Sequence, residues 1–238
     1  FIFKKMKSFF ELVVKDIISK VVFEKTFFII PNRRSKVFLK KEIVKSIKNT
    51  TLSPQILSID DFIELISEMN ESPKTTQIFY LYEAYMKVSK KKDFESYSLF
   101  RNWSNMLLDD INDVDMSLAK SNDIFKYLFE IQKLQTFSEE EGKTKLEFWK
   151  MIPQIVNEFK KILQKKDNAN KGLCHLKAKE NINIFSNSHS DNSFIFIGLN
   201  SLSKSEEFII NHILENNNSK IYWDCESIYL KNKNHQSG

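Results

Sequence analysis

Glycine is almost absent from this chain, and its scarcity excludes the commonest phosphate-binding loops. The 238 residues contain four glycines, Gly142, Gly172, Gly198 and Gly238, so the first 141 residues have none. A P-loop needs glycines so that backbone N–H groups can wrap a phosphate, and a dinucleotide-binding fingerprint needs three at the first strand-to-helix turn. Neither loop can be built here, so we predict that the chain does not bind a nucleoside triphosphate.

The overall composition is that of a folded globular protein. Apolar residues make up 42% of the chain and charged residues 28%, which is too apolar for a disordered segment. No apolar run approaches the roughly 18 residues of a membrane-spanning helix. The two cysteines, Cys174 and Cys225, are far apart, which speaks against a disulfide framework or a zinc ribbon. We therefore expect a cytoplasmic protein with no membrane partner.

The positions of the arginines are more informative than the formal net charge of +5. Lysine and arginine together number 36, and only Arg33, Arg34 and Arg101 are arginines. Abundant lysine beside asparagine, isoleucine and phenylalanine is the composition expected from an AT-rich genome, so the basic balance alone does not indicate nucleic acid. Arg33 and Arg34, in contrast, are adjacent and closely follow a strand-like run.

Short apolar runs alternate with amphipathic segments, which is typical of an α/β fold with a parallel sheet. The first amphipathic helix is expected from Met6 to Val21. A second helix is expected to carry Val37, Val44 and Ile47 on its inner side and lysines opposite. Helix starts are expected at Asn32, at the capping-box pair Ser58 and Asp61, and at the pair Ser203 and Glu206. The expected strands are Thr26–Ile30, Gln55–Ile59, Ser193–Ile197 and Lys220–Trp223.

The middle of the chain lacks strand-like runs. From about Ile59 to Lys166 the sequence shows only helical periods. We therefore predict a sheet domain formed by residues 1–60 and 180–238. Residues 61–179 would form an all-helical insertion between its second and third strands.

Candidate ligand-binding residues follow the first two expected strands. In an open parallel sheet, ligands collect at the carboxyl ends of the strands, and the N-terminus of the next helix favours anions. Asn32, Arg33 and Arg34 occupy this place after the first strand, and paired arginines suit the phosphates of a nucleic-acid backbone. Ser58 occupies the equivalent place after the second strand. The alternative interpretation is structural: helix caps followed by solvated charges.

Two other groups of residues have the side chains of metal ligands but not the spacing of a metal site. The acidic run from Asp109 to Asp115 lacks the glycine and glutamate of a calcium loop, since Leu118 and Ile124 stand at those places. We interpret this run as a solvated helix end. No catalytic triad can be assigned. The histidines have no zinc-binding spacing and are expected at the surface or in loops: His175, His189, His212 and His235.

Five segments, taken in order, resemble one protein family. They resemble the N-terminal part of the PD-(D/E)XK nuclease family proteins of Bacteroidetes, the AddB-like subunit of helicase-nuclease complexes that process double-strand DNA ends. The resemblance covers nearly the whole chain from Met6. The segments are FIIPNRRSKVFLKKEI (28–43), PQILSIDDFIELIS (54–67), LLDDINDVD (107–115), FIFIGLNSLSKSEEFIINHIL (194–214) and KIYWDCESIYL (220–230).

The resemblance implies an inactivated superfamily 1 helicase-like domain. Its fold would be a RecA-like parallel sheet, of the P-loop NTPase type but without the P-loop, with a helical insertion. Asn32, Arg33 and Arg34 fall where that superfamily places its first DNA-contacting strand end. Ser58 falls at the next such end, where Asp60 replaces the usual histidine.

The resemblance also implies that the chemistry lies outside this sequence. Gly198 and Leu199 stand where active helicases carry an Asp-Glu pair for magnesium and water, so both halves of an ATP site are missing. The family's nuclease domain, with its magnesium-binding carboxylates, would lie beyond Gly238. This fragment is therefore expected to have no catalytic residue, metal or cofactor, whereas the full-length family protein is a PD-(D/E)XK exonuclease.

Strand-end residues and resemblance together predict a non-catalytic DNA-binding and scaffold region of an AddB-like helicase-nuclease in recombinational repair. The expected partners are DNA, single-stranded or as duplex ends, and an AddA-like helicase-nuclease subunit. The alternative is a protein-interaction module that holds a helicase partner without contacting DNA.

Overall fold

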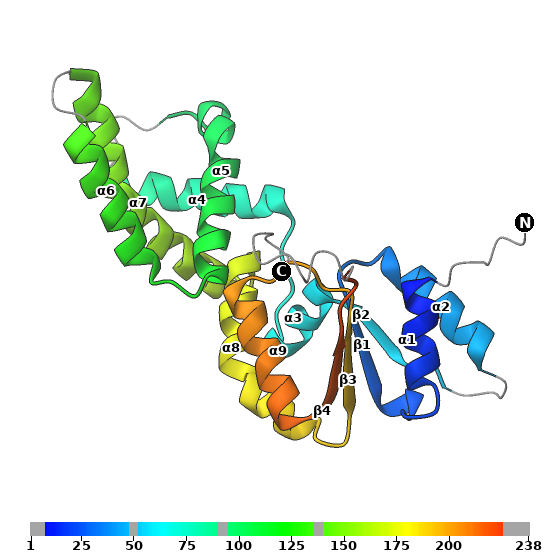
Figure 1. Ribbon diagram of the computed structural model, residues 1–238. Coiled ribbons are helices and arrows are strands. Elements are labelled where there is room, and N and C mark those ends of the chain that lie inside the picture. Colours follow the sequence, from blue (N-terminus) through cyan, green and yellow to red (C-terminus); the bar gives the residue numbers. More distant parts are fainter. Residues whose placement is uncertain (1–7, 48–51, 90–94, 136–139, 226–238) are drawn as a thin grey trace, which may run out of the picture. The chain divides into compact units, whose positions relative to one another are not determined.

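The computed structural model describes residues 8–47, 52–89, 95–135 and 140–225 (Figure 1). The chain divides into two compact units, which are described separately below. The first, here called the sheet unit, comprises Phe1–Ile63, Ile182–Leu202 and Glu207–Gly238. The second, here called the helical unit, comprises Glu64–Asn181 and Ser203–Glu206.

The sheet unit is built around parallel strands, and the prediction of an α/β fold is confirmed. Phe28 of the first strand lies opposite Ile56 of the second and Ile195 of the third. The two central strands are buried along almost their whole length, as expected for uninterrupted apolar strands covered on both faces. In the described residues the order is β2-β1-β3-β4, with β1 Thr26–Ile30, β2 Gln55–Ser58, β3 Ser193–Ile197 and β4 Asn218–Tyr222.

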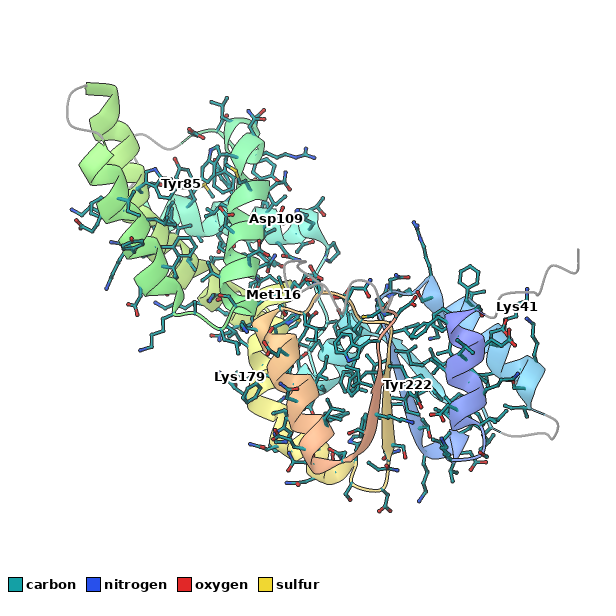
Figure 2. All side chains as sticks on the ribbon, viewed as in Figure 1. Lys41, Tyr85, Asp109, Met116, Lys179 and Tyr222 are labelled. Carbon is teal, nitrogen blue, oxygen red and sulfur yellow. The ribbon has the colours of Figure 1, made fainter. Side chains whose placement is uncertain are left out.

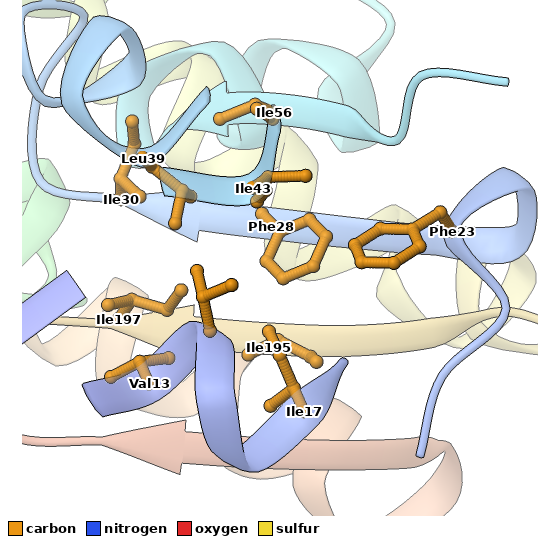
Figure 3. Packing of buried hydrophobic residues seen from close by; sticks show 11 residues of the cluster. Val13, Ile17, Phe23, Phe28, Ile30, Leu39, Ile43, Ile56, Ile195 and Ile197 are labelled. Atoms are coloured by element: carbon orange, nitrogen blue, oxygen red, sulfur yellow. The ribbon is translucent and has the colours of Figure 1, made fainter. Parts of the chain in front are cut away.

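Helices α1 (Phe9–Ile17) and α2 (Ser35–Ser46) cover one face of the sheet (Figure 1). The side chain of Ser8 caps α1 by accepting a hydrogen bond from the backbone N–H of Glu11 at 3.2 Å. The expected start at Met6 lies outside the described residues. Figure 3 shows the apolar cluster between these helices and the sheet, which includes Val13, Ile17, Phe23, Phe28, Ile30, Leu39, Ile43, Ile56, Ile195 and Ile197.

Aromatic rings fill the opposite face of the same sheet. Phe27 of β1 and Phe194 of β3 stack with their ring centroids 5.0 Å apart. The ring centroid of Phe62 on α3 (Ile59–Ser67) lies 6.1 Å from that of Phe194 and 5.8 Å from that of Phe185 on α8 (Lys171–Ser188). Helix α9 (Lys204–Asn216) lies on this side too (Figure 1). The sheet is therefore enclosed by helices on both faces.

The orientation of α2 differs from the prediction. We expected Val37 and Val44 to face inward, but they are 68% and 64% exposed, and Leu39 and Ile43 are buried instead. Apolar residues occur on more than one side of this helix, so its periodicity does not select a single inner face. Leu39 and Ile43, four residues apart, form the stripe that packs on the sheet. The consequence is an apolar and basic outer face on α2.

In the helical unit, aromatic side chains pack between helices α4 (Lys74–Val88) and α5 (Tyr97–Met116). The ring centroid of Phe100 on α5 is 5.1 Å from that of Tyr82 on α4 and 4.5 Å from that of Trp103 on α5. Apart from a bridging residue, Glu71, the described residues from Ile59 to Lys165 contain only helices as regular elements, as predicted. They are α3, α4, α5, α6 (Ser121–Gln135) and α7 (Glu140–Lys165).

In the described part of the chain, no helix combines the length and the apolarity that a bilayer requires.

Candidate functional site

The order of the strands defines where a ligand would be expected on the sheet unit. From β1 the chain moves outward to β2, returns past β1 to β3, and continues outward to β4. In open α/β sheets, ligands bind beyond the carboxyl ends of the strands where the strand order reverses. In this sheet the reversal falls between β1 and β3. The segments that follow these two strands, 31–34 and 198–200, therefore flank the expected position.

The segment after β3 packs closely against apolar side chains. Gly198 has a φ of +67°, in the left-handed region that favours glycine. A Cβ atom at this position would lie 3.2 Å from Cε1 of Phe9, so the close approach of that ring also favours glycine. The backbone N–H of Gly198 donates to the carbonyl of Tyr222 at 2.8 Å, and Leu199 is buried. This strand end thus offers neither a carboxylate nor a free glycine N–H.

The segment after β1 contains the residue predicted to cap α2. The Asn32 side-chain oxygen accepts hydrogen bonds from the backbone N–H of Ser35 at 3.0 Å and from its hydroxyl at 3.2 Å. The Asn32 side chain therefore closes the turn that leads into α2, whereas the residue directly before the helix is Arg34, which makes no side-chain cap. Arg33 and Arg34 lie between Asn32 and the first residue of α2, and both are exposed.

Arg33 forms an ion pair that joins the ends of β1 and β2. Its Nη2 and Nε atoms lie 2.6 and 3.0 Å from Oδ1 of Asp61. The Arg33 side chain is 75% exposed, whereas the Asp61 side chain is only 22% exposed. One edge of the guanidinium is thus held by a carboxylate, while most of the side chain is exposed to solvent.

Asp61 also completes the predicted capping box at the start of α3. Its Oδ2 atom accepts a hydrogen bond from the backbone N–H of Ser58 at 3.3 Å, and its own N–H donates to the Ser58 hydroxyl at 3.2 Å. Ser58 itself is buried. Of the predicted site residues, Ser58 therefore positions Asp61, which in turn holds Arg33.

The protonation state of Asp61 follows from these contacts. Partial burial acts to raise the pKa of its carboxyl, but hydrogen bonds from Arg33 and Ser58 outweigh that effect, and the net shift is downward. Asp61 is therefore an anion at neutral pH. The Asp61 carboxylate therefore competes with any external phosphate for the guanidinium of Arg33.

Helix α2 extends the positive charge away from the strand end. Lys36, Lys40, Lys41 and Lys45 are all exposed. Glu42, which is the only acidic residue of this helix, accepts a hydrogen bond from Lys45 Nζ at 2.6 Å. The exposed face that starts at Arg34 is therefore strongly basic along the whole helix.

The acidic run on α5 has a structural role in the helical unit. Asp115, expected in a solvated helix end, is instead buried and accepts from Lys160 Nζ at 2.6 Å. A Cβ on Gly172 would lie 2.7 Å from Cβ of Asp115, so glycine allows the start of α8 to approach α5. Asp109 pairs with Lys74 at the surface, with 2.8 Å between oxygen and nitrogen. Burial, followed by the charges of its acidic neighbours, raises the pKa of Asp110.

One histidine also departs from the expectation of surface positions. His175 is buried in the helical unit, and its Nδ1 lies 2.7 Å from the Ser205 hydroxyl. The ring of His189 stacks on Phe185, with 4.2 Å between centroids. His189 is only partly buried and lies in a turn, as expected, so His175 alone of these two departs from the prediction. His235 lies outside the described residues.

No protein-family model matches the chain, and no curated protein matches it significantly. The resemblance described above therefore stays a prediction. What the fold itself defines is a parallel α/β unit with a basic strand end.

Proposed function

We propose that this chain is a non-catalytic, nucleic-acid-binding scaffold, whose sheet unit contacts the sugar-phosphate backbone through Arg33 and Arg34. The supporting observation is the placement of Arg33 and Arg34 at the carboxyl end of β1, beside the reversal of strand order. An arginine offers several donors in a planar fork, which suits phosphate oxygens. Contacts of this kind position a protein on nucleic acid without reading its sequence.

The two arginines have different roles in this proposal. Arg34 is exposed, and among the described residues it makes no ion pair within 4.0 Å with an acidic side chain. Arg33 exchanges part of its contact with Asp61 for a phosphate. Asn32 fixes the turn that presents both, and Ser58 acts indirectly by orienting Asp61.

At the level of the whole protein, we propose an AddB-like helicase-nuclease subunit that processes DNA ends for recombinational repair. In this proposal the sheet unit is a RecA-like domain without nucleotide chemistry, the helical unit is its insertion, and the partner is an AddA-like subunit. Magnesium would be used by a separate nuclease domain. The apolar surroundings of Gly198 are in keeping with a strand end that does not handle MgATP.

The salt dependence of single-stranded DNA binding tests the backbone contacts. Replacing Arg33 and Arg34 by alanine should remove about two phosphate contacts, which makes the slope of log affinity against log salt shallower by about 1.4, at about 0.7 per contact. A matched control is the pair Lys126→Ala and Lys150→Ala, two exposed cations of the helical unit. If both double variants change the slope equally, the arginine site is refuted.

A protein-interaction module remains the second candidate function. It is favoured by the exposed Val37 and Val44 on α2, because exposed apolar side chains that are clustered on one element mark contact surfaces. Absence of DNA binding by the folded wild-type chain at low salt would select this candidate.

A further inference from the structure

We propose that Phe38 is a stacking platform for an unpaired base of single-stranded nucleic acid. This inference rests on the proposed function, which supplies the backbone contacts, and adds a base contact to them. The residues that carry it are all on α2, within the sheet unit.

The exposure of Phe38 has no explanation in the packing of the sheet unit. Its side chain is 61% exposed in the first turn of α2, while Leu39 and Ile43 fill the interface with the sheet. Among the described aromatic rings, Phe38 has no ring partner, unlike Phe27 and Phe194 on the opposite face of the sheet. Its ring is therefore accessible to an external planar group.

Cations lie one helical turn away from this ring on both sides. Positions 34, 38, 41 and 45 follow a spacing of four, three and four residues, which places them along one side of a helix. Arg34 precedes Phe38 and Lys41 follows it, and Lys41 projects from α2 away from the strands (Figure 2). Such a face can stack a base on the ring and attract the backbone phosphates to the neighbouring cations.

The composition of this face favours single-stranded nucleic acid over other partners. In a duplex, neighbouring base pairs cover the faces of each base, so stacking on a side chain requires an unpaired base. A helix that lies in a membrane surface needs a continuous apolar face. On α2, Lys40 and Lys41 interrupt the apolar positions between Val37 and Val44. Phosphate charge complements this interrupted, basic surface.

Variants of Phe38 test the stacking directly. Phe38→Ala in the whole 238-residue chain should weaken binding to a thymidine oligomer by about 5- to 160-fold, the range for loss of one stacked base. Its affinity for an abasic oligomer of equal length should not change, and neither should the salt slope, because no charge is removed. Tyr127→Ala, which removes an exposed aromatic side chain of the helical unit, is the control and should leave affinity unchanged.

A second variant keeps the test informative if alanine disturbs the helix. Phe38→Trp should keep the affinity for the thymidine oligomer and should show fluorescence quenching on binding in excess of that of the wild type. Circular dichroism confirms that each variant is folded.

The outcomes separate the two proposals. If Phe38→Ala binds the thymidine oligomer as tightly as wild type, while Arg33→Ala with Arg34→Ala still makes the slope shallower, stacking is refuted and the backbone proposal survives. If the folded wild type binds no oligomer, both are refuted. Preferential binding of wild type to phosphatidylserine vesicles, or equal losses on the abasic and thymidine oligomers, would also overturn stacking.

Discussion

The Arg33–Asp61 pair allows a charge-neutralising substitution to strengthen DNA binding. In Asp61→Asn the competitor for Arg33 loses its charge but keeps a side-chain oxygen that can accept from the N–H of Ser58, as Oδ2 does in the wild type at 3.3 Å. The start of α3 should therefore persist, although loss of a negative charge in the first helical turn costs about 0.3–1 kcal/mol of stability. Thermal unfolding measures that cost separately.

The size of the gain follows from the exposure of the pair. An ion pair with one partner as exposed as Arg33, at 75%, is worth only about 0.2–1 kcal/mol. Removing this competition should therefore raise affinity by about 1.4- to fivefold at low salt. Because Arg33 already makes one of the two phosphate contacts of the wild type, the salt slope should change by much less than the about 0.7 of a whole additional contact.

Fluorescence anisotropy with a labelled thymidine oligomer, from about 50 to 200 mM salt, measures the affinity and its dependence on salt. The control is Asp191→Asn, which removes the same charge from an exposed residue that precedes β3, at the other end of the strands. Equal affinities and slopes for the two variants would show that only the net charge matters. That result would refute the role of Arg33 at the strand end.

Three further predictions concern the core, the acid limb of stability and nucleotide binding. Phe28 is fully buried on a central strand, so Phe28→Ala should lower the free energy of unfolding by about 3–5 kcal/mol in chemical denaturation. Hydrogen bonds from Lys20, then Lys220 and Tyr222, hold the pKa of Asp16 well below its usual range. The stability that Asp16 contributes is thus complete above its unfolded pKa of about 3.9 and is lost as pH falls below it, so Asp16→Asn should flatten the acid limb of a stability–pH profile. Calorimetry with millimolar MgATP should show no saturable binding, and a one-to-one isotherm would contradict the interpretation of the glycine-poor sequence.

Local patterns were sufficient to predict the elements that depend on neighbouring residues. The strands Thr26–Ile30 and Ser193–Ile197 have the predicted bounds because each is a short, apolar run buried on both faces. The pairs Ser58–Asp61 and Ser203–Glu206 form the predicted capping boxes, since a box requires only the correct residues three positions apart.

Features that depend on distant parts of the chain were not predicted. Arg33 and Asp61 are separated by 28 positions, and their pairing requires β1 and β2 to be neighbours that run in the same direction. The sequence did indicate that both residues follow expected strands, which would place them at the same edge of a parallel sheet. It did not specify which side chains would meet there. The burial of Asp115 likewise depends on Lys160, which is 45 positions away.

Helix α8 and the orientation of α2 were missed for a different reason. The buried residues of α8 are divided between the two units: Cys174 belongs to the helical unit and Phe185 to the sheet unit. A helix that contributes to two cores does not show one apolar stripe. Helix α2 has more apolar side chains than the sheet can cover. The sequence therefore does not show that Phe38 is one of those that face outward.

The central claim is that the end of β1 and the outer face of α2 bind single-stranded nucleic acid. Photo-crosslinking of the folded chain to a bromodeoxyuridine-containing oligomer, followed by digestion with a protease that does not cut at lysine and by mass spectrometry, tests it most directly. The account predicts crosslinks within residues 32–45, with Phe38 as the principal site, and their loss in Arg33→Ala with Arg34→Ala. Crosslinks confined to Glu64–Asn181, or none from a folded chain at low salt, would contradict it.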